Sequence, residues 1–579
     1  MLGLSVLTAV VTGLHSLTAP GVALPVPDVA SAAYEAENAT LSQAVVDDKH
    51  AGFSGAGFVD YVNAPGGYVE FTVTVAAPGN ADLVVRYANA APADRPLDIT
   101  VNGSVVATGS PFISTGAWDD WREVTVKAPL RAGTNKVRLT ATAAAGGPNL
   151  DRLTVKTTES PMVTSVSALR SAIEEATPGQ RIVVADGRYS VDDDIPIKQK
   201  TGVTITAQTV GGVTFTGTGT FVLDRSSRVS IEGFVFRQRV GLTVPAGSTH
   251  VRIARNVFRL NESSTDKINW LTVEGDDAEI ANNTFMNKTT HGVFLQVTGA
   301  GSTMAQRVAI RRNHFYNHQW TDNGGESIRL GYGDKGRVPA HAVVEYNLFE
   351  KAEGDDEALS VKSSNNVIRA NTILGGKRGS LTLRAGDRTT VEGNFLIGGP
   401  IGLRIYGGRH TIVNNYIAGA GTDGIVLGAG YDDKHDRAAG IRLLFNTVVN
   451  AGGLAVRVQG GANPAKDCTI ANNILVRPAA GALLRLGGAE HTTVNGNMLW
   501  DTVAGSDKRD PRLVQDTAGT YRLGPASPAI DASKGSYPEV KTDMDQQPRT
   551  SIPDVGADER HPGPGTGPLT RADVGPAGH

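Results

Sequence analysis

The sequence contains a single cysteine, Cys468, among its 579 residues. One thiol excludes an internal disulfide framework and any metal site built from several cysteines. Buried cysteine usually packs as a small apolar group, and we expect Cys468 to do so. The fold must therefore be held together by its core and its hydrogen bonds.

Aromatic residues are scarce at 6%, whereas glycine is abundant with 69 residues, a combination that favours turn-rich β structure. The formal net charge of −3 gives no general attraction for nucleic acid, so any site for a polyanion must be a local patch. No segment beyond the first residues approaches the run of about 18 apolar residues that spans a membrane. We expect neither nucleic acid nor a membrane as a partner, and the length favours two or more domains. The sequence does not indicate an oligomeric state.

Residues 1–32 contain an apolar run followed by small residues, although no basic segment precedes the run. "ASA" before Ala33 and "GVA" before Leu24 both suit a signal peptidase. We therefore expect residues 1–32 to be a signal peptide and the protein to be secreted and extracellular.

Residues 33–156 alternate between apolar and polar residues in short runs such as "GGYVEFTVTV" and "TNKVRLTATA". Glycine, proline, asparagine and aspartate separate these runs, which predicts an antiparallel β-sandwich. The opening "YEAEN" and the closing "NLDRLTV" resemble the two ends of carbohydrate-binding modules of families 6 and 35.

That resemblance implies two sites in the module. Acids near its ends would hold a structural calcium ion, here Glu35, Glu37 and Asp151. A sugar site would be lined by Tyr87, Trp118 and Asn149. The acids could instead be solvated strand ends, and Trp118 could belong to the core, because large aromatic side chains are mostly buried.

A repeat follows that consists of an asparagine, any one residue and then a large apolar residue. Examples are "RNVF", "NNTF" and "YNLF". The repeated asparagines are Asn256, Asn283, Asn313, Asn347, Asn371, Asn394, Asn415, Asn446, Asn473 and Asn497. Recurrence at this spacing predicts an all-β fold, a right-handed parallel β-helix, over residues 157–562. Stacked asparagines at one bend would bond along the axis of the helix. The Pro/Gly-rich tail, residues 563–579, is predicted to be disordered.

The asparagines also place four basic residues. Lys362, Arg384 and Arg404 lie nine, ten and eleven residues before the next asparagine of the series. Arg329 joins them once the insertion "GYGDKGRVPAHA" is discounted. We therefore predict one column of cations on successive coils, roughly 4.8 Å apart. Such a column suits a polymer that carries an anion on each sugar, although a solvated charged face is the alternative.

Acidic residues lie next to this column in "GDDEALSVK". Strict alternation would put Lys362 on the opposite face from Asp355 and Glu357. They share a face only if the chain bends or bulges near Ala358. With Asn323, these carboxylates would make an oxygen-rich site for a hard cation, Ca²⁺; plain salt bridges are the alternative.

The segments "NGGESIRLG", "DDEALSVKSSNNVIRANT" and "GSLTLRAGDRTTVEGNF" closely resemble polysaccharide lyase family 6, which includes alginate lyases and chondroitinase B. The resemblance implies calcium at Asn323, Asp355 and Glu357. It makes Lys362 the base and Arg384 the acid, with Arg329 and Arg404 as substrate contacts. Ala385 follows Arg384, where the family usually has histidine.

The implied reaction is β-elimination, in which the proton at C5 of a uronate is removed and a 4,5-unsaturated sugar is released. Lys362 must be neutral to take this proton, and nearby positive charges favour that state. Alginate ranks first as substrate and chondroitin or dermatan sulfate second. A uronan C5-epimerase, a β-helix hydrolase with two opposed carboxylates and a non-catalytic polyanion-binding protein remain as alternatives.

Overall fold

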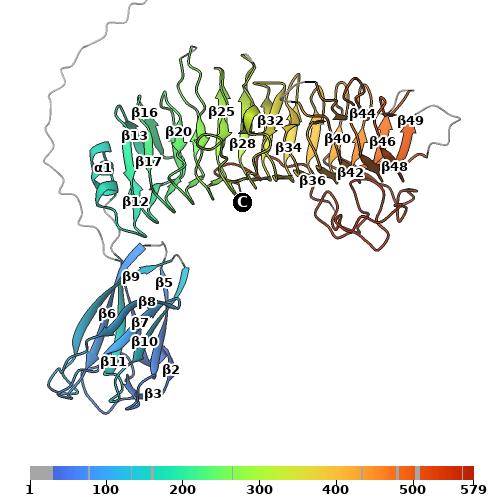
Figure 1. Ribbon diagram of the computed structural model, residues 1–579. Coiled ribbons are helices and arrows are strands. Elements are labelled where there is room, and N and C mark those ends of the chain that lie inside the picture. Colours follow the sequence, from blue (N-terminus) through green and yellow to red (C-terminus); the bar gives the residue numbers. More distant parts are fainter. Residues whose placement is uncertain are drawn as a thin grey trace, which may run out of the picture. The chain divides into compact units, whose positions relative to one another are not determined.

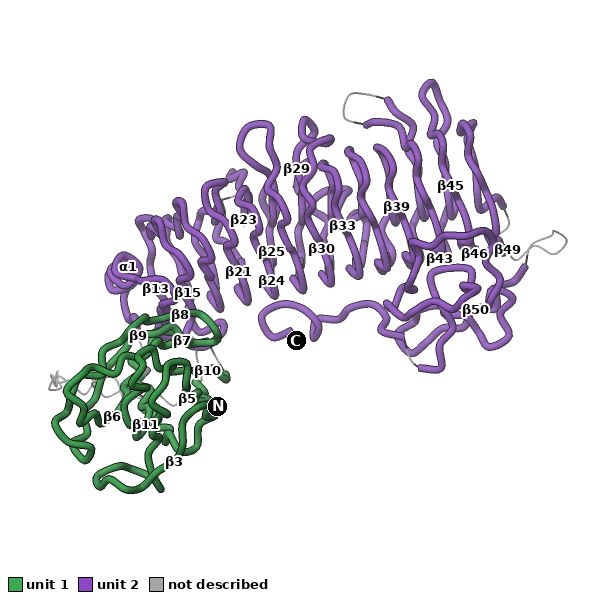
Figure 2. Tube along the Cα trace, turned by 60° about the horizontal axis from the view of Figure 1, so that its bottom comes forward, with its two compact units in different colours: residues 1–161 green, residues 162–579 purple. Residues whose placement is uncertain are grey.

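The computed structural model describes residues 30–75, 79–131, 133–157, 162–263, 265–321, 323–431, 435–477, 481–501, 509–563 and 565–578. The chain divides into two compact units, residues 1–161 and 162–579 (Figure 2). Of the predicted signal peptide, residues 1–29 lie outside the described residues. In the part that the structure describes, no helix has both the length and the apolar character needed to cross a membrane.

The N-terminal unit is the predicted antiparallel sandwich. One sheet contains β1 (Ala30–Glu35), β3 (Ala44–Asp47), β4 (Phe58–Tyr61), β6 (Gly79–Ala88), β9 (Arg122–Leu130) and β11 (Asn149–Thr157). The other contains β2 (Thr40–Ser42), β5 (Tyr68–Val75), β7 (Leu97–Val101), β8 (Ser104–Ser110) and β10 (Gly133–Ala141). A one-turn 3₁₀ helix, η1 (Ala36–Asn38), follows β1. Apolar side chains that alternate along these strands, including Phe71, Leu83 and Leu153, form the core between the sheets.

The second unit is a parallel β-helix, as the asparagine series predicted, built from three long parallel sheets (Figure 1). The first sheet has 13 strands: β12 (Arg181–Val184), β15 (Thr204–Ala207), β18 (Ser230–Glu232), β21 (Arg252–Ala254), β24 (Glu279–Ala281), β27 (Ala309–Arg311), β30 (Val343–Glu345), β33 (Val367–Arg369), β36 (Thr390–Glu392), β39 (Thr411–Val413), β42 (Arg442–Leu444), β45 (Thr469–Ala471) and β48 (Thr493–Asn495). The second also has 13: β13 (Gly187–Ser190), β16 (Val213–Thr216), β19 (Phe234–Phe236), β22 (Val257–Phe258), β25 (Thr284–Lys288), β28 (His314–His318), β31 (Leu348–Ala352), β34 (Thr372–Gly375), β37 (Phe395–Gly398), β40 (Tyr416–Ala418), β43 (Thr447–Val449), β46 (Ile474–Arg477) and β49 (Met498–Asp501). The third has 12: β14 (Ile195–Lys198), β17 (Phe221–Asp224), β20 (Leu242–Val244), β23 (Leu271–Val273), β26 (Leu295–Val297), β29 (Ile328–Gly331), β32 (Glu357–Lys362), β35 (Ser380–Ala385), β38 (Leu403–Ile405), β41 (Ile425–Leu427), β44 (Val456–Val458) and β47 (Leu484–Arg485).

Helix α1 (Val166–Glu175) precedes the first coil. The Ser165 side chain caps it by accepting a hydrogen bond of 3.1 Å from the Ala168 amide. Leu169 and Ile173 are buried in the β-helix core, and α1 packs against β12 and β14. The helix thus covers apolar surface at the first coil, where the sheets would otherwise end.

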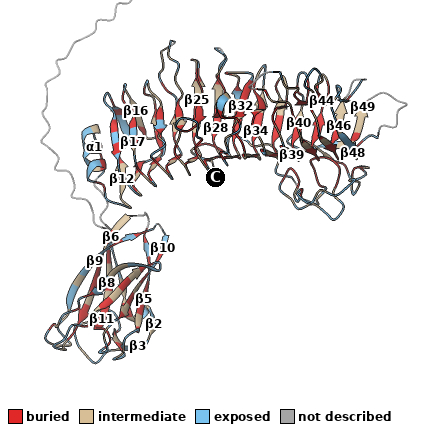
Figure 3. Ribbon diagram, in the orientation of Figure 1, coloured by how far each residue is buried: buried red, intermediate tan, exposed pale blue. Residues whose placement is uncertain are grey.

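The asparagine series forms the predicted ladder. At each step the backbone amide and the side-chain amide of one asparagine donate to the Oδ1 of the next, as Asn371 does to Asn394 at 3.0 Å. From Asn256 to Asn473 these side chains are buried. Two residues after the ladder asparagines, aromatic rings of successive coils also stack: the centroids of Phe258 and Phe285 are 4.6 Å apart. Figure 3 shows how buried residues recur on every coil.

The last part of the chain differs from the predicted disordered tail. After a small hairpin of β50 (Leu513–Gln515) and β51 (Tyr521–Leu523), the chain runs back to the middle coils (Figure 1). There Arg571 pairs with Glu350, and Val574 is only 3% exposed. A Pro/Gly-rich composition disfavours strands and helices but does not prevent an irregular segment from binding to an existing surface.

Candidate active site

Two β-bulges shape the region where β32 and β35 lie side by side. The register shifts between Glu357 and Leu359, so that the extra residue in β32 is Ala358. Because Leu359 and Val361 point into the core, this bulge places Glu357 on the same outward face as Lys362. The predicted bulge near Ala358 is therefore present.

The register of these strands corrects the predicted single column of cations. Lys362 pairs in register with Ala385, and Arg384 is the extra residue of β35. A different row of residues in register runs across four strands. It contains, in order, Arg329, Ser360, Thr382 and Arg404. Arg329 and Arg404 thus share one outward row, separated by Ser360 and Thr382. Lys362 and Arg384 lie one pleat further along the strands.

These side chains surround one hollow of about 430 Å³, which we call the charged hollow. Its lining contains all seven residues predicted for the site, namely Asn323, Arg329, Asp355, Glu357, Lys362, Arg384 and Arg404. It also contains Gly324, Glu326, Asp356, Tyr431 and His435. The lining carries four acidic residues (326, 355, 356, 357) and four Lys/Arg residues (329, 362, 384, 404), so its formal charges cancel. An anionic polymer therefore gains little net attraction here unless a further cation is present.

Glu326 is the residue that the sequence interpretation missed. It is 2% exposed, and its Oε1 accepts a hydrogen bond of 2.8 Å from the Lys362 Nζ. Its Oε2 accepts one of 3.0 Å from the Arg329 Nε and pairs with the same guanidinium at Nη2. Burial raises the pKa of Glu326, but the contacts with Arg329 and Lys362 outweigh it and lower the pKa to about 2. Glu326 is thus an ionised carboxylate that holds the side chains of Lys362 and Arg329 in place.

The predicted metal ligands lie together and are partly unsatisfied. Burial, together with the negative charges of Glu326 and Glu357, raises the pKa of Asp355. Glu357 is 2% exposed, and its Oε1 accepts a hydrogen bond of 3.1 Å from Arg384. Its Oε2 is buried without a hydrogen-bond partner among the described residues. A buried carboxylate oxygen needs a donor or a cation, so the set with Asn323 fits a hard divalent ion.

A second hollow, of about 590 Å³, adjoins the first and shares Lys362 and Arg384 with it. We call it the adjoining hollow; its other lining residues are Tyr332, Gly333, Asp334 and Lys335. The inserted loop after β29 forms this wall and reaches Ala385, because a Cβ added at Gly336 would lie 2.7 Å from the Ala385 Cβ. The space next to Ala385 is thus filled by the loop, which leaves no room there for a larger side chain. Lys362 and Arg384 consequently lie between two openings.

In the N-terminal unit the predicted calcium ligands lie around one turn. The Ser54 hydroxyl donates to Glu35 at 2.8 Å and lies 3.1 Å from Asp151. The Ala56 amide donates to Glu37 Oε1 at 2.7 Å. These carboxylates therefore converge, but Arg86 already pairs with the buried Asp151.

The predicted sugar contacts of the module are mostly buried. Tyr87 and Asn149 are each 2% exposed, and the Tyr87 ring packs edge-on against Phe112. A ring buried in this way offers little surface for stacking on a sugar, and the sugar site of the module stays a prediction. Trp118 is half-buried, between His50 and the Arg95 guanidinium, whose Cζ is 5.2 Å from the ring centroid.

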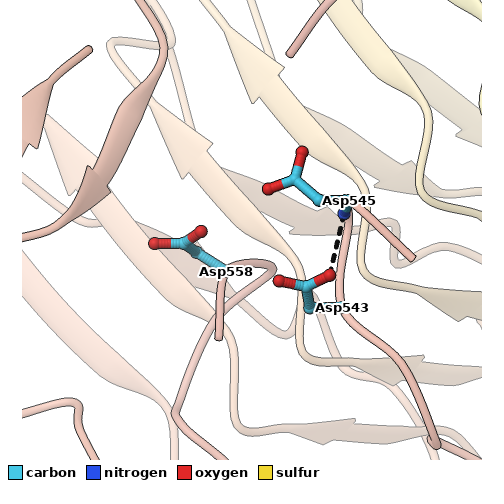
Figure 4. A group of neighbouring side chains, drawn as sticks. All are labelled: Asp543, Asp545 and Asp558. Carbon is cyan, nitrogen blue, oxygen red and sulfur yellow. Dashed lines mark hydrogen bonds between the residues drawn. The ribbon is translucent and has the colours of Figure 1, made fainter. Parts of the chain in front are cut away.

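A further acidic cluster lies near the end of the chain and contains Asp543, Asp545 and Asp558 (Figure 4). Arg522 pairs with both Asp545 and Asp558, and Asp543 accepts a hydrogen bond of 2.9 Å from the Asp545 amide. Another amide, that of Leu523, donates to Asp558 at 2.8 Å. Arginine and backbone donors thus occupy these carboxylates, which hold the irregular segment together.

Each of the two units contains a match to a family model. Residues 163–425 match the model for Chondroitinase B, and residues 32–158 match that for family 35 carbohydrate-binding modules. The chain therefore contains a chondroitinase B-type domain. A family 35 carbohydrate-binding module precedes it.

Curated relatives share a segment of about the length of the module. An exo-β-D-glucosaminidase of Amycolatopsis orientalis is 52% identical over 122 residues, which is 21% of this chain and 12% of that protein. Endo-1,4-β-xylanase B of Cellvibrio japonicus (strain Ueda107) is 38% identical over 113 residues, which is 19% of this chain and 18% of that protein. This chain thus spans less than a fifth of the length of either relative.

Solved structures resemble the β-helix. The alginate lyase AlyGC of family PL6 is 22% identical, with a TM-score of 0.53, over 68% of this chain and 57% of that one. The PL6 polysaccharide lyase Pedsa3628 from Pseudopedobacter saltans is 19% identical, with a TM-score of 0.53, over 72% of this chain and 99% of that one. At this identity the likeness shows the fold. Together with the family model, it supports a polysaccharide lyase.

Proposed function

We propose that the protein is a secreted polysaccharide lyase that cleaves a uronate-containing polysaccharide, alginate first, by β-elimination. Lys362 is the base, Arg384 is the acid, and Arg329 and Arg404 bind the substrate. The observation that carries the proposal is the charged hollow, where a lysine and an arginine lie beside a buried, incompletely bonded carboxylate. Hydrolysis by two opposed carboxylates is disfavoured because this lysine–arginine pair lies among the acids.

The barrier to elimination is electrostatic. Removing the C5 proton adds negative charge next to a carboxylate that is already charged, so the site must supply positive charge at that point. Asn323, Asp355 and Glu357 would hold a calcium ion, which when bound neutralises the substrate carboxylate. This extra charge is what the balanced lining of the hollow lacks.

Lys362 is held in place for the proton transfer. Its Nζ lies 2.8 Å from Glu326 Oε1, and its side chain is 14% exposed, so it faces the hollow while remaining anchored. Because Lys362 pairs with Glu326 as an ammonium, it must first lose a proton to solvent. The resulting amine takes the C5 proton, and the electrons of the C–H bond form the C4–C5 double bond as the bond from C4 to the glycosidic oxygen breaks. Arg384, 35% exposed, is placed to donate a hydrogen bond or a proton to the departing oxygen.

The N-terminal module would keep the enzyme on its polymer, since modules of this family bind carbohydrate. A separate binding site raises the local concentration of substrate around the active site without taking part in the chemistry. Its ligand need not be the sugar that is cleaved.

The test is the ultraviolet absorbance of a 4,5-unsaturated product, followed separately with alginate and with dermatan sulfate in the presence of Ca²⁺. We expect absorbance to rise with alginate. The rate of this rise should fall at least about 1,000-fold for Lys362→Ala, which removes the base. Chelation should abolish the rise, and Ca²⁺ alone should restore it. Lys335→Ala, which changes a lysine of the adjoining hollow outside the predicted catalytic set, is the matched control.

Each other result has a definite meaning. A rise with dermatan sulfate alone would change the substrate but keep the mechanism. Full activity of Lys362→Ala would contradict its role as base. Altered sugar-ring NMR signals without chain cleavage would identify an epimerase, and binding without any chemical change would identify a polyanion-binding protein.

A further inference from the structure

An aromatic pair lines the charged hollow on a loop that the proposed mechanism does not use. Tyr431 and His435 follow β41, and their rings stack with centroids 4.2 Å apart at an interplanar angle of 17°. His435 in turn meets the Tyr406 ring edge-on at 5.0 Å. Tyr406 and His435 are each 6% exposed, whereas Tyr431 is 65% exposed. The pair is thus a solvent-exposed ring supported from behind by two buried ones.

The backbone is shaped to hold these supporting rings. A Cβ added at Gly428 would lie 2.2 Å from the Tyr406 ring, so only glycine allows the chain to pass there. The Gly407 amide donates to the Asp436 carbonyl at 3.0 Å, which ties the residue after His435 to the preceding coil. Such support fixes a ring before any ligand binds, which reduces the entropy that binding must overcome.

The place of the pair limits what it can bind. Tyr431 and His435 share the charged hollow with Arg384 and Arg404, and the predicted cation ligands line the same hollow. One face of Tyr431 is covered by His435, so its large exposed area comes from the other face and the edges. An exposed ring beside two guanidinium groups suits a flat apolar surface that carries anions at its rim.

We propose that Tyr431, supported by His435 and Tyr406, is a stacking subsite for a pyranose ring of the uronate chain that neighbours the sugar at Lys362. The C–H face of that ring packs on Tyr431 while its carboxylate meets Arg404. Arg404 suits this role because its guanidinium has no hydrogen bond or ion pair within the described part of the chain. The inference rests on the proposed function, which it extends by a positioning residue.

The experiment compares Tyr431→Ala and Tyr431→Phe with the wild-type protein on uronate oligomers of increasing length. We expect Tyr431→Ala to raise KM about 10-fold on long oligomers, with kcat little changed, because a stacking contact contributes to binding. Tyr431→Phe keeps the ring and should stay close to wild type. The increase in KM should vanish for oligomers too short to reach the ring. Tyr537→Ala, a half-buried tyrosine outside both hollows, is the matched control.

Three results would overturn the inference: an unchanged KM for Tyr431→Ala on long oligomers, an increase that is the same at every length, or a large loss of kcat in Tyr431→Phe. The last would assign the role to the hydroxyl instead of the ring. If the wild-type protein forms no unsaturated product, the proposed function fails. Calorimetric titration of Lys362→Ala and of Lys362→Ala/Tyr431→Ala with the same oligomers then still tests the subsite, because equal affinities would refute it.

Discussion

At the scale of single residues, Glu326 determines how the charges of the hollow are arranged. Its carboxylate is shared between Lys362 and Arg329, which lie on neighbouring coils. Removing it would leave two cations in mutual repulsion in a poorly solvated place. The residue therefore acts on the chemistry by holding other groups, and it also makes folding sensitive to acid.

The first prediction concerns that sensitivity. The pKa of Glu326 is lowered from 4.5 to about 2 on folding, so its stabilisation is present above about pH 4.5 and is lost as the pH falls towards 2. We expect the wild-type free energy of unfolding to fall by on the order of 3 kcal/mol more than that of Glu326→Gln across this interval. Denaturant titrations at several pH values measure it, with exposed Glu490→Gln as the control. Parallel curves for wild type and Glu326→Gln would contradict the assignment.

The sequence could identify most of the site but not this residue. Lys362, Arg384 and their acidic neighbours stand in motifs that resemble a known family, so they could be named without coordinates. Glu326 stands in one of the same motifs, between Asn323 and Arg329, yet its role depends on a partner one coil away. Which residues face each other across coils depends on loop length and bulges, and neither follows from local patterning.

At the scale of elements, the asparagine ladder determines how coils are joined. Each buried side chain satisfies groups on its own coil and on the next, so the loss of one residue leaves donors and acceptors on two coils unpaired. Asn394 bonds to the Ile368 carbonyl at 2.9 Å and accepts from Asn371 at 3.0 Å. The ladder therefore stabilises the β-helix from the coil of Asn256 to that of Asn497.

The second prediction follows from these bonds. Asn394→Ala would remove the acceptor of the Asn371 backbone amide and the hydrogen bonds that Asn394 donates to the Ile368 carbonyl and to Asn415, and we expect it to destabilise the β-helix by about 3 kcal/mol. Denaturant unfolding followed by circular dichroism measures this loss. Asn495→Ala, at an exposed position at the end of β48, should change stability by less than about 0.5 kcal/mol. Equal effects of the two substitutions would show that the ladder does not carry this stability.

The same ladder explains why the fold was predictable and the alignment of the cations was not. A side-chain ladder requires its residue to recur on successive coils, so the asparagine spacing reveals the order of the coils from Asn256 to Asn497, although the first coils, which lack the asparagine, are not counted by it. Counting back placed Lys362 nine and Arg404 eleven residues before an asparagine, and this difference of two residues separates two rows on the same face of the sheet. The prediction that all four cations form one column failed for this reason.

At the scale of the whole molecule, the end of the chain is bound to the middle of the β-helix. The Leu569 amide donates to the Thr372 hydroxyl at 2.8 Å, and the Gly575 amide to the Arg312 carbonyl at 2.9 Å. Arg571 pairs with Glu350, whose other neighbour is His314 at 2.7 Å. Composition indicated a free tail because it reports on local propensity, whereas the contacts of Leu569 and Arg571 are made across 197 and 221 residues of sequence.

The third prediction tests this segment. Removing the residues after Gly563 would expose the surface under Val574 and break the pair with Glu350, and we expect a decrease in Tm of about 2–4 °C. Activity should be unchanged, since none of the described residues of this segment, 565–578, lines either hollow. Differential scanning calorimetry measures the decrease, and Arg571→Ala should give only part of it. An unchanged Tm after truncation would mean that the segment contributes nothing to stability.

Because of the bulge at Ala358, the site depends on the exact number of residues between Glu357 and Lys362. In a regular strand, residues an odd number of positions apart face opposite ways, and Glu357 and Lys362 are five apart. Only the inserted residue lets both face the hollow. Deletion of one residue here would therefore point either Glu357 or Lys362 into the core while the other still faced the hollow. The chemistry therefore requires the correct alternation of side chains along β32 as well as the correct residues.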